Sequence, residues 1–316
     1  MRVLITGITG FAARHLAHHL LAAGHEVFGT TRQRLGLPAT PLAQERIVTL
    51  DLRDADAVVE VVRRVRPDGL FHLAAVTDVA ASLADPDATY RVNLFGSLHV
   101  FAAVRMAAPA CRVVWVGSSH AYGDIAAADL PVTERQLLRP TSPYAASKAA
   151  ADLAAYQWAR GAGQHILRLR PFNHTGPGQA PLFVCADFAR QIVEIERGVR
   201  PPRIEVGNVE VVRDFTDVRD IVRAYVLAWA RGVPGEAYNV CSGVGRTPRS
   251  IIDDLMRLSG VQAAVTVRGD RQRSTDVPAI VGSASALQRA TGWSPEISWD
   301  QTLRDLLGDW RTRPVS

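Results

Sequence analysis

The stretch TGITGFAA, residues 6–13, lies between the first strand-like run of the chain and its first helical pattern. Gly7 and Gly10 allow a tight turn and a close approach of the backbone to a phosphate. The helix after them offers free N–H groups and a partial positive charge. Ala13 stands where a third glycine is often found and is still small enough for close helix–strand packing. The position of this glycine-rich stretch after the first strand favours a dinucleotide site over a plain strand-to-helix turn.

The rest of the first 170 residues alternates between short apolar runs and longer helical patterns. The runs lack strict polar alternation, as expected of parallel strands covered on both faces. The predicted strands are 2–6, 26–31, 46–50, 69–74, 112–117 and 165–170, and the predicted helices are 11–22, 54–66, 88–107 and 143–160. This alternation predicts an α/β fold with a doubly wound parallel sheet of the Rossmann type.

The pattern changes after Pro171, where the Gly/Pro-rich stretch PFNHTGPGQAP (171–181) predicts a loop. Beyond it the elements are more irregular, with helices expected at 185–197, 217–231, 248–259 and 300–312 and strands at 203–207 and 238–243. We therefore expect a dinucleotide-binding domain at 1–171, with returning segments near 208–242, and a smaller C-terminal substrate-binding lobe at 172–316.

Composition limits the function classes. The 316 residues are 47% hydrophobic and 21% charged, with a net charge of +5, which suits a globular protein with an anionic partner. The arginines are scattered, so a phosphorylated small molecule is a better partner than nucleic acid. Three distant cysteines indicate neither a disulfide framework nor a zinc site. With no signal peptide and no apolar run of about 18 residues, we expect a cytoplasmic protein and no membrane partner.

The end of the second predicted strand bears on the choice of nicotinamide cofactor. An acidic residue there would bind the ribose 2′-hydroxyl of NAD(H). The sequence instead reads TTRQR (30–34), whose hydroxyls and guanidiniums suit a 2′-phosphate. We predict that NADP(H) is preferred, with NAD(H) as the other option. Alternatively, Arg32 and Arg34 are solvated loop charges.

Two further strand ends suit the same cofactor. Asp51, after the third strand, could accept a hydrogen bond from the adenine amino group. Ala74 and Ala75, after the fourth, are small enough for the cofactor to lie across the strand ends. Simple packing would explain these residues equally well.

The stretches VGSSHAYG (116–123) and SPYAASKAA (142–150) carry the candidate chemistry. Ser118 ends the fifth strand, at the sheet edge where ligands of such folds bind. Tyr144 and Lys148 are four residues apart and share one helix face. A lysine ammonium beside the phenol would lower its pKa, which suits proton transfer between a carbonyl and an alcohol. A nucleophilic serine is the weaker hypothesis, because no GxSxG turn leads into a helix.

Five motifs in order, GITGFAA, GSSHAYG, YAASK, RPFNHTGPGQ and RDFTDVRD, resemble the extended short-chain dehydrogenase/reductases that act on nucleotide sugars. The resemblance covers nearly the whole chain, and within the family it is strongest to the group that reduces GDP-4-keto-6-deoxy-mannose. It implies a catalytic triad of Ser118, Tyr144 and Lys148. Together with the strand-end reasoning it gives the cofactor-binding set Gly7, Thr9, Gly10, Phe11, Ala12, Thr31, Arg32, Asp51, Leu52, Leu73, Ala74, Ala75, Tyr144, Lys148 and Pro171.

The resemblance also implies a substrate site. Asn173, Arg213 and Arg273 match positions beside the substrate diphosphate, where guanidiniums can bind the anion through two hydrogen bonds. Surface charge is the other interpretation of each arginine. Asn93 matches a position near the active site, and an ordinary helix asparagine is its alternative. The substrate set is completed by Ser119 and His120.

His120 is a departure from part of the family. Members that dehydrate hexoses carry an acidic residue at this position, and without it 4,6-dehydration is not expected. The implied activity is NADPH-dependent reduction of a nucleotide-linked 4-keto-6-deoxyhexose, GDP-4-keto-6-deoxy-D-mannose to GDP-6-deoxy-D-mannose. Alternatives are an epimerase or 4,6-dehydratase on the same scaffold and a non-catalytic NADP(H)-binding sensor. Such sensors often lose the tyrosine or the lysine, and both are present.

Three further expectations concern helices and histidines. Family members commonly dimerise through helices corresponding to 88–107 and 143–160, so a homodimer is predicted, although these helices could merely pack on the sheet. His15, His18 and His19 lack a third-ligand context, so we expect a solvated helix face and no metal site. His174 either hydrogen-bonds the substrate or braces its loop.

Overall fold

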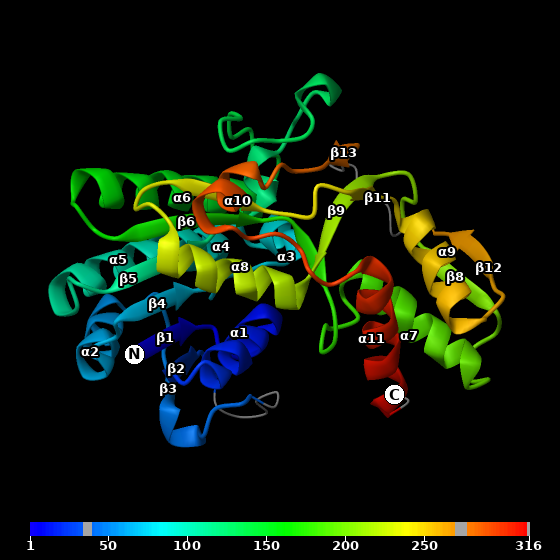
Figure 1. Ribbon diagram of the computed structural model, residues 1–316, viewed down its shortest axis with the longest axis horizontal. Helices are drawn as coiled ribbons and strands as arrows, with labels where there is room; N and C mark the ends of the chain where they lie inside the picture. The colour runs from blue at the N-terminus through cyan, green and yellow to red at the C-terminus, as the bar shows by residue number, and fades with distance from the viewer. Residues whose placement is uncertain (34–39, 269–276, 315–316) are drawn as a thin grey trace.

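A computed structural model describes residues 1–33, 40–268 and 277–314. Its centre is a seven-stranded, fully parallel sheet in the order β10-β6-β5-β4-β1-β2-β3 (Figure 1). The order reverses between β1 and β4, which is the switch point where open α/β sheets bind ligands. The strands are β1 (Arg2–Thr6), β2 (Glu26–Thr31), β3 (Ile47–Thr49), β4 (Gly69–His72), β5 (Arg112–Val116), β6 (Ile166–Pro171) and β10 (Ala237–Val240). The predicted doubly wound fold is confirmed.

Helices cover both faces of this sheet. One core holds Val3 and Ile5 of β1 together with side chains of α1 (Phe11–Ala22), α8 (Val218–Arg231) and α10 (Ser285–Thr291). Leu4 of β1 points to the other core, with α2 (Ala55–Val65), α5 (Gly96–Ala107) and α6 (Pro143–Gly161). Successive strand residues thus enter opposite cores, which explains the nearly continuous hydrophobic runs of the sequence.

The predicted helix 88–107 is helical over its whole length, but it begins two residues earlier and contains a π-helical turn that the pattern did not predict. The structure has α3 (Val79–Ala84), α4 (Pro86–Tyr90), a π-helical turn η2 (Arg91–Phe95) and then α5. The Asp85 carboxylate caps α4 and Pro86 occupies its first turn, which starts a new helix there. In the π turn the Gly96 N–H donates to the Arg91 carbonyl, one residue further along than in an α-helix.

The C-terminal elements form the second lobe, at the right in Figure 1, and this lobe has its own hydrophobic core. A small sheet is ordered β11-β9-β13, with β7 also paired to β9, and β12 pairs with β8. These elements are β7 (Asn173–Thr175), β8 (Arg203–Val206), β9 (Val212–Asp217), β11 (Gly245–Arg246), β12 (Ala264–Val267), β13 (Ala279–Ile280), α7 (Val184–Glu196), α9 (Pro248–Ser259) and α11 (Trp299–Thr312). By contrast, β10 and α8 return to the seven-stranded sheet and its cover.

Short elements complete the described chain, with the 3₁₀ turns η1 (Gln44–Arg46), η3 (Ser119–Tyr122) and η4 (Ala127–Asp129).

Several predicted strands end earlier in the structure than the sequence pattern suggests. The run 238–243 leaves the sheet after Val240, because the Ser242 and Gly243 N–H groups donate to the Asp214 carboxylate. Among the helices described, none has the length and apolar character needed to cross a membrane.

Candidate active site

The turn after β1 brings two predicted cofactor positions into contact. Gly7 has φ +74°, and a Cβ on it would lie 2.9 Å from the Ala74 Cα. Its carbonyl accepts a hydrogen bond from the Gly10 N–H at 2.9 Å, and Gly10 is the N-cap of α1. Both the left-handed backbone and the close approach require glycine at position 7. The loop therefore lies directly against the end of β4, as a dinucleotide site needs.

The other predicted cofactor positions lie at the same edge, because the carboxyl ends of parallel strands meet there. Thr31 ends β2, where its hydroxyl donates to the Gln33 carbonyl at 3.0 Å, and Arg32 follows as an exposed residue. The remaining members lie near strand ends or at the start of α1: Leu52 three residues after β3, Leu73 and Ala75 just after β4, Pro171 as the last residue of β6, and Thr9, Phe11 and Ala12 around the start of α1. Arg34 lies outside the described residues.

Asp51 already has a cationic partner. Its carboxylate accepts hydrogen bonds from the Arg53 guanidinium at 3.0 and 2.6 Å, and this lowers the pKa of Asp51. The positive charge of Arg32 acts on the same carboxylate to a lesser extent. Sequence reasoning missed Arg53, although its spacing of two residues from Asp51 was the available signal. An adenine amino group would have to share this carboxylate with Arg53.

The structure brings Ser118, Tyr144 and Lys148 together. Ser142 caps α6 and Pro143 begins it, so Tyr144 and Lys148 share the face of its first turns, and both are buried. Ser118 caps η3, accepting a hydrogen bond from the His120 N–H at 3.2 Å, and its side chain hydrogen-bonds the Tyr144 phenol. A hydroxyl and a phenol thus converge at the carboxyl end of β5.

The expected lowering of the Tyr144 pKa by lysine is wrong for this structure. Burial raises the pKa of Tyr144, and the hydrogen bond with Ser118 opposes the rise only in part. The Lys148 ammonium donates to the Val116 carbonyl at 2.8 Å, and burial lowers its pKa to about 8. Loss of solvation therefore sets the direction of both shifts, and the opposing contribution at Tyr144 comes from Ser118 and not from Lys148. Lys148 is also the only lysine of the chain.

A small hollow beside this site contains four of the predicted substrate residues. It is lined by Ser119, His120, Phe172, Asn173, Arg213, Asp214 and Ile280. The His120 ring lies edge-on to the Tyr144 ring, with centroids 5.8 Å apart. The carboxylate in this lining, that of Asp214, is buried and held by Ser242 and Gly243. The fifth predicted substrate residue, Arg273, lies outside the described residues.

Asn93 is a bracing residue in this structure. Its side chain accepts from the Val76 N–H at 2.8 Å and donates to the Val76 carbonyl and to the Ser147 hydroxyl, both at 3.0 Å. It therefore fixes the segment after β4 against helix α6. Sequence reasoning placed Asn93 near the site but could not identify these partners.

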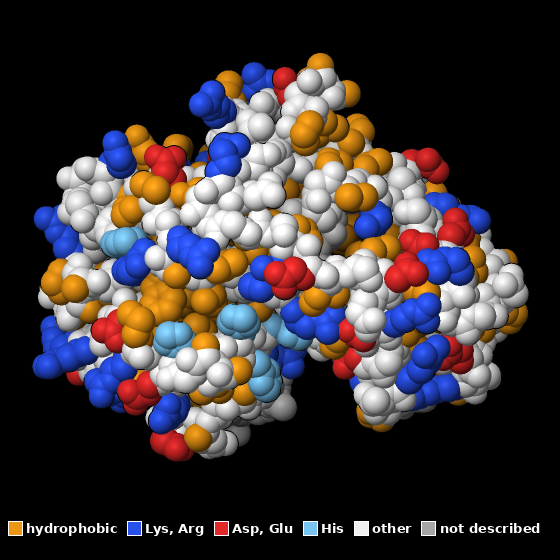
Figure 2. All heavy atoms as spheres, in the orientation of Figure 1, with side chains coloured by type: hydrophobic (Ala, Val, Ile, Leu, Met, Phe, Trp, Pro, Cys, Tyr) orange, Lys and Arg blue, Asp and Glu red, His pale blue; other side chains and the backbone are white. Residues whose placement is uncertain are grey.

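His174 braces its loop. Its Nδ1 hydrogen-bonds the Phe172 carbonyl at 3.1 Å, and its ring stacks on Phe11 at 6.0 Å between centroids. His15 hydrogen-bonds the Pro177 carbonyl at 2.8 Å, so it joins α1 to the same loop and is not wholly solvated. Figure 2 shows histidine side chains over the α1 region. Within the described ranges, three or more potential metal ligands do not gather at any point.

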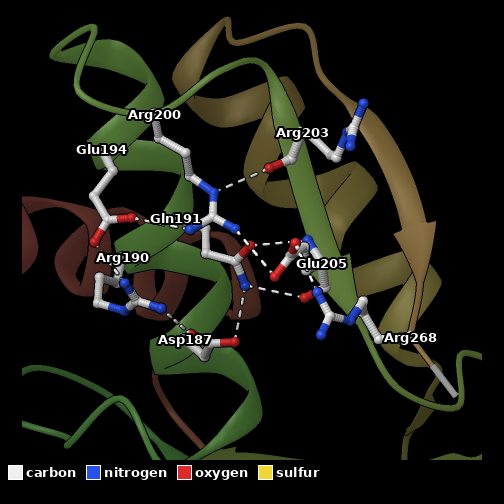
Figure 3. Close-up of polar contacts among 8 residues, drawn as sticks. All are labelled: Asp187, Arg190, Gln191, Glu194, Arg200, Arg203, Glu205 and Arg268. Carbon is white, nitrogen blue, oxygen red and sulfur yellow. Dashed lines mark hydrogen bonds and ion pairs between the residues drawn. The ribbon is translucent and has the colours of Figure 1, made fainter. Parts of the chain in front are cut away.

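A polar cluster stabilises the second lobe (Figure 3). Arg200 pairs with Glu194 of α7 and with Glu205 of β8, and Arg268, just after β12, also contacts Glu205. Gln191 exchanges hydrogen bonds with the backbone of Glu205. These contacts hold α7 against the two-stranded sheet, and the remaining labelled members are Asp187, Arg190 and Arg203.

The fold and the site geometry agree with comparisons to known proteins. A family model described as GDP-mannose 4,6 dehydratase matches residues 4–306. The chain belongs to this family. Within it, a GDP-6-deoxy-D-mannose reductase from Pseudomonas aeruginosa is 36% identical, over 99% of this chain and 98% of that protein. The resemblance to extended short-chain dehydrogenase/reductases is therefore confirmed.

Solved structures of family members extend the agreement to three dimensions. RMD from Pseudomonas aeruginosa complexed with NADPH superposes with a TM-score of 0.87 at 35% identity, covering 99% of both chains. A UDP-glucose 4-epimerase from Thermus thermophilus in complex with NAD gives a TM-score of 0.88 at 30% identity, again covering 99% of both. The same scaffold thus carries reductases and epimerases, so the local chemistry of the site must distinguish them.

Proposed function

We propose that this protein is an NADPH-dependent reductase of a nucleotide-linked 4-keto-6-deoxyhexose, converting GDP-4-keto-6-deoxy-D-mannose to GDP-6-deoxy-D-mannose. The observation that carries the proposal is the pairing of the buried Tyr144 phenol with Ser118, beside a hollow that presents His120 in place of an acid. The 36% identical reductase supports the same assignment.

Protonation of Tyr144 favours reduction. Because burial raises its pKa, Tyr144 is a neutral phenol near pH 7 and can donate its proton to an alkoxide that forms at C4. Ser118 hydrogen-bonds the phenol and would orient the substrate carbonyl, while Lys148 would contact the nicotinamide ribose. NADPH, when bound, supplies the hydride. Hydride and phenolic proton together account for the two hydrogens added to the ketone.

The described residues fit NADP(H), with NAD(H) as the alternative. The Gly7–Gly10 turn and the first turn of α1 would hold the pyrophosphate, and Arg32 would pair with the 2′-phosphate. The NADPH complex of the similar reductase supports this preference. On the substrate side, Asn173 and Arg213 line the hollow and would contact the diphosphate, and Arg273 is proposed there on the resemblance alone.

Dehydration is disfavoured by the available acids and bases. Elimination of water from the hexose would need a carboxylate beside the tyrosine. The carboxylate that lines the hollow, Asp214, is committed to backbone N–H groups of Ser242 and Gly243. His120 occupies the place next to Tyr144. An epimerase remains the competing function, and it would recycle a tightly held cofactor.

The test is stoichiometry. Purified enzyme is incubated with NADPH and GDP-4-keto-6-deoxy-D-mannose, and the decline of nicotinamide absorbance is compared with the product formed. The proposal predicts one NADPH consumed per product molecule. Product formation without net loss of NADPH would indicate an epimerase, and NADPH binding without turnover would indicate a sensor. Parallel incubation with GDP-mannose tests for the dehydratase, which the proposal predicts to be absent.

We also propose a homodimer and a cytoplasmic location. An apolar stripe on η2 and α5 lies beside one on α6, and its members are exposed: Met106 by 70%, Leu153 by 61% and Phe95 by 50%. Exposed apolar side chains on these neighbouring helices suit contact with a second copy of the chain. Leu153→Arg should convert a dimer to a monomer in sedimentation, and an unchanged mass would contradict the proposal.

The cysteines support the proposed cytoplasmic location. All three cysteines are unpaired and buried, which agrees with a reducing compartment.

A further inference from the structure

A chain of buried hydrogen bonds begins at the cofactor loop. The Ala74 N–H donates to the Thr6 hydroxyl at 3.2 Å, and that hydroxyl lies 2.7 Å from Nδ1 of His72. Nε2 of His72 lies 3.1 Å from the Ser97 hydroxyl, which donates to the Asn93 carbonyl at 2.6 Å. Thr6, His72, Ser97 and Asn93 are each at most 2% exposed.

The series of hydrogen bonds from Thr6 to Asn93 allows only one arrangement of its protons. The Ser97 proton goes to the Asn93 carbonyl, which can only accept, so the Ser97 oxygen must itself accept from His72 Nε2–H. It also accepts from the Trp115 indole N–H at 3.1 Å. Burial lowers the pKa of His72 to about 3, so the ring is neutral and Nδ1 accepts the Thr6 proton. We assign the Nε2–H tautomer from these partners.

The far end of the chain reaches the catalytic tyrosine. Asn93 sits in the π turn, and its side chain donates to Ser147, whose hydroxyl donates to the Tyr144 carbonyl at 2.8 Å. Asn93 also holds Val76, two residues after the Ala74–Ala75 pair. We call the segment Ala74–Val76 after β4 the cofactor shelf. Neutral hydrogen bonds therefore connect the cofactor shelf to the first turn of α6.

We propose that His72 is a positioning residue for the reaction, setting the distance between the cofactor shelf and the Tyr144 phenol through Ser97 and Asn93. The proposal rests on the proposed reductase function. Misplacing a proton donor by a fraction of an ångström slows chemistry without changing how the cofactor binds at the phosphate loop. The alternative is a set of buried polar groups that stabilise the core and nothing more.

The experiment compares Ser97→Ala and His72→Gln with Thr291→Val as the matched control. Ser97→Ala cuts the chain away from both ligands, and His72→Gln retains an N–H directed at Ser97. Thr291 also buries a hydroxyl, bonded to the Leu287 carbonyl at 2.8 Å, but in α10. The measurements are kcat, the Kd of NADPH by fluorescence, Tm, and crystal structures of the NADP⁺ complexes.

Ser97→Ala should lower kcat roughly ten-fold or more, with the Kd of NADPH within about two-fold and the Tyr144 Oη displaced from the nicotinamide. His72→Gln should retain part of kcat, and the double variant should lose less than the product of the single losses. Thr291→Val should lower Tm but leave kcat unchanged. An unmoved Tyr144 in Ser97→Ala, or a Kd that rises in step with the fall in kcat, overturns the proposal. If the wild-type protein does not oxidise NADPH, the proposed function fails, and the crystal structures still decide the role of His72.

Discussion

Two buried positive centres lie against helix α6, Lys148 on the helix itself and the Arg168–Arg170 pair of β6, and different partners stabilise their charges. Lys148 donates to the Val116 carbonyl, and burial lowers its pKa to about 8. One turn on, Asp152 accepts from the guanidiniums of Arg168 at 2.5 Å and Arg170 at 2.8 Å, and it helps raise the pKa of Arg170. The first centre can change its charge near neutral pH, whereas the second is fixed.

The difference distinguishes the catalytic residues from the residues that hold them in place. Near the carboxyl end of β5, the chain surrounds Tyr144 and Lys148 with neutral partners, including Ser118, Ser147 and the Val116 carbonyl. The charged cluster of Asp152, Arg168 and Arg170 extends to Tyr122, whose hydroxyl accepts a hydrogen bond from Arg170 at 2.9 Å. Since Tyr122 ends the η3 turn that Ser118 caps, the cluster stabilises the segment that carries Ser118.

Removing the carboxylate of the charged cluster should have the largest effect on stability. Asp152→Asn keeps the shape but leaves two buried guanidiniums without a counter-charge, so the free energy of unfolding should fall by about 3–5 kcal/mol. Urea denaturation measures it. The control is Asp253→Asn, whose partner Arg249 is exposed, with an expected change below about 1 kcal/mol. Equal changes in the two variants would contradict the account.

Titration of Lys148 tests the other centre directly. As the only lysine, it gives a single side-chain signal in protein labelled with [¹³C]lysine. The midpoint should lie near 8 in the folded protein, because burial disfavours the ammonium, and return to about 10.4 in urea. A folded midpoint above 10 would remove the contrast between the two centres.

Acid should weaken the neutral chain that contains His72. Its pKa is about 3 in the folded state and about 6.5 when unfolded, so the unfolded chain binds more protons between these values. Stability is therefore lost as pH falls below 6.5, by about 2 kcal/mol from this residue at pH 5. His72→Gln should show a correspondingly shallower loss between pH 7 and pH 5, and parallel curves for the two proteins would refute this.

Tyr122→Phe should have the smallest effect, about 1–2 kcal/mol. It removes the hydroxyl that donates to Asn239 at 2.6 Å and accepts from Arg170, while the packing of the ring remains. In combination with Asp152→Asn the losses should be less than additive, because both residues belong to one network. Strict additivity in urea denaturation would show that the cluster does not act as a unit.

Local patterns made much of this predictable from the sequence. The Gly7–Gly10 turn, the position of Ser118 just after β5 and the i, i+4 pair Tyr144–Lys148 each depend on a few neighbouring residues and on strand order. Asp85 and Pro86 also gave a local signal for the start of α4, two residues before the predicted start at 88.

Long-range contacts were not accessible in this way. The pKa of Tyr144 depends on burial by the whole fold, so the nearby lysine was a misleading guide. The partners of Asp152 lie 16 and 18 residues away on β6, and those of His72 lie 66 and 25 residues away. No sequence pattern links such residues before the strands are in register.

Tyr144 is the proton donor of the proposed reaction, and Tyr144→Phe tests this role directly. The ring and its packing remain, so the Kd of NADPH should stay within about two-fold of wild type, whereas NADPH oxidation with the 4-keto substrate should slow roughly a hundred-fold or more. A Tyr144→Phe enzyme that retains the wild-type rate would contradict the mechanism.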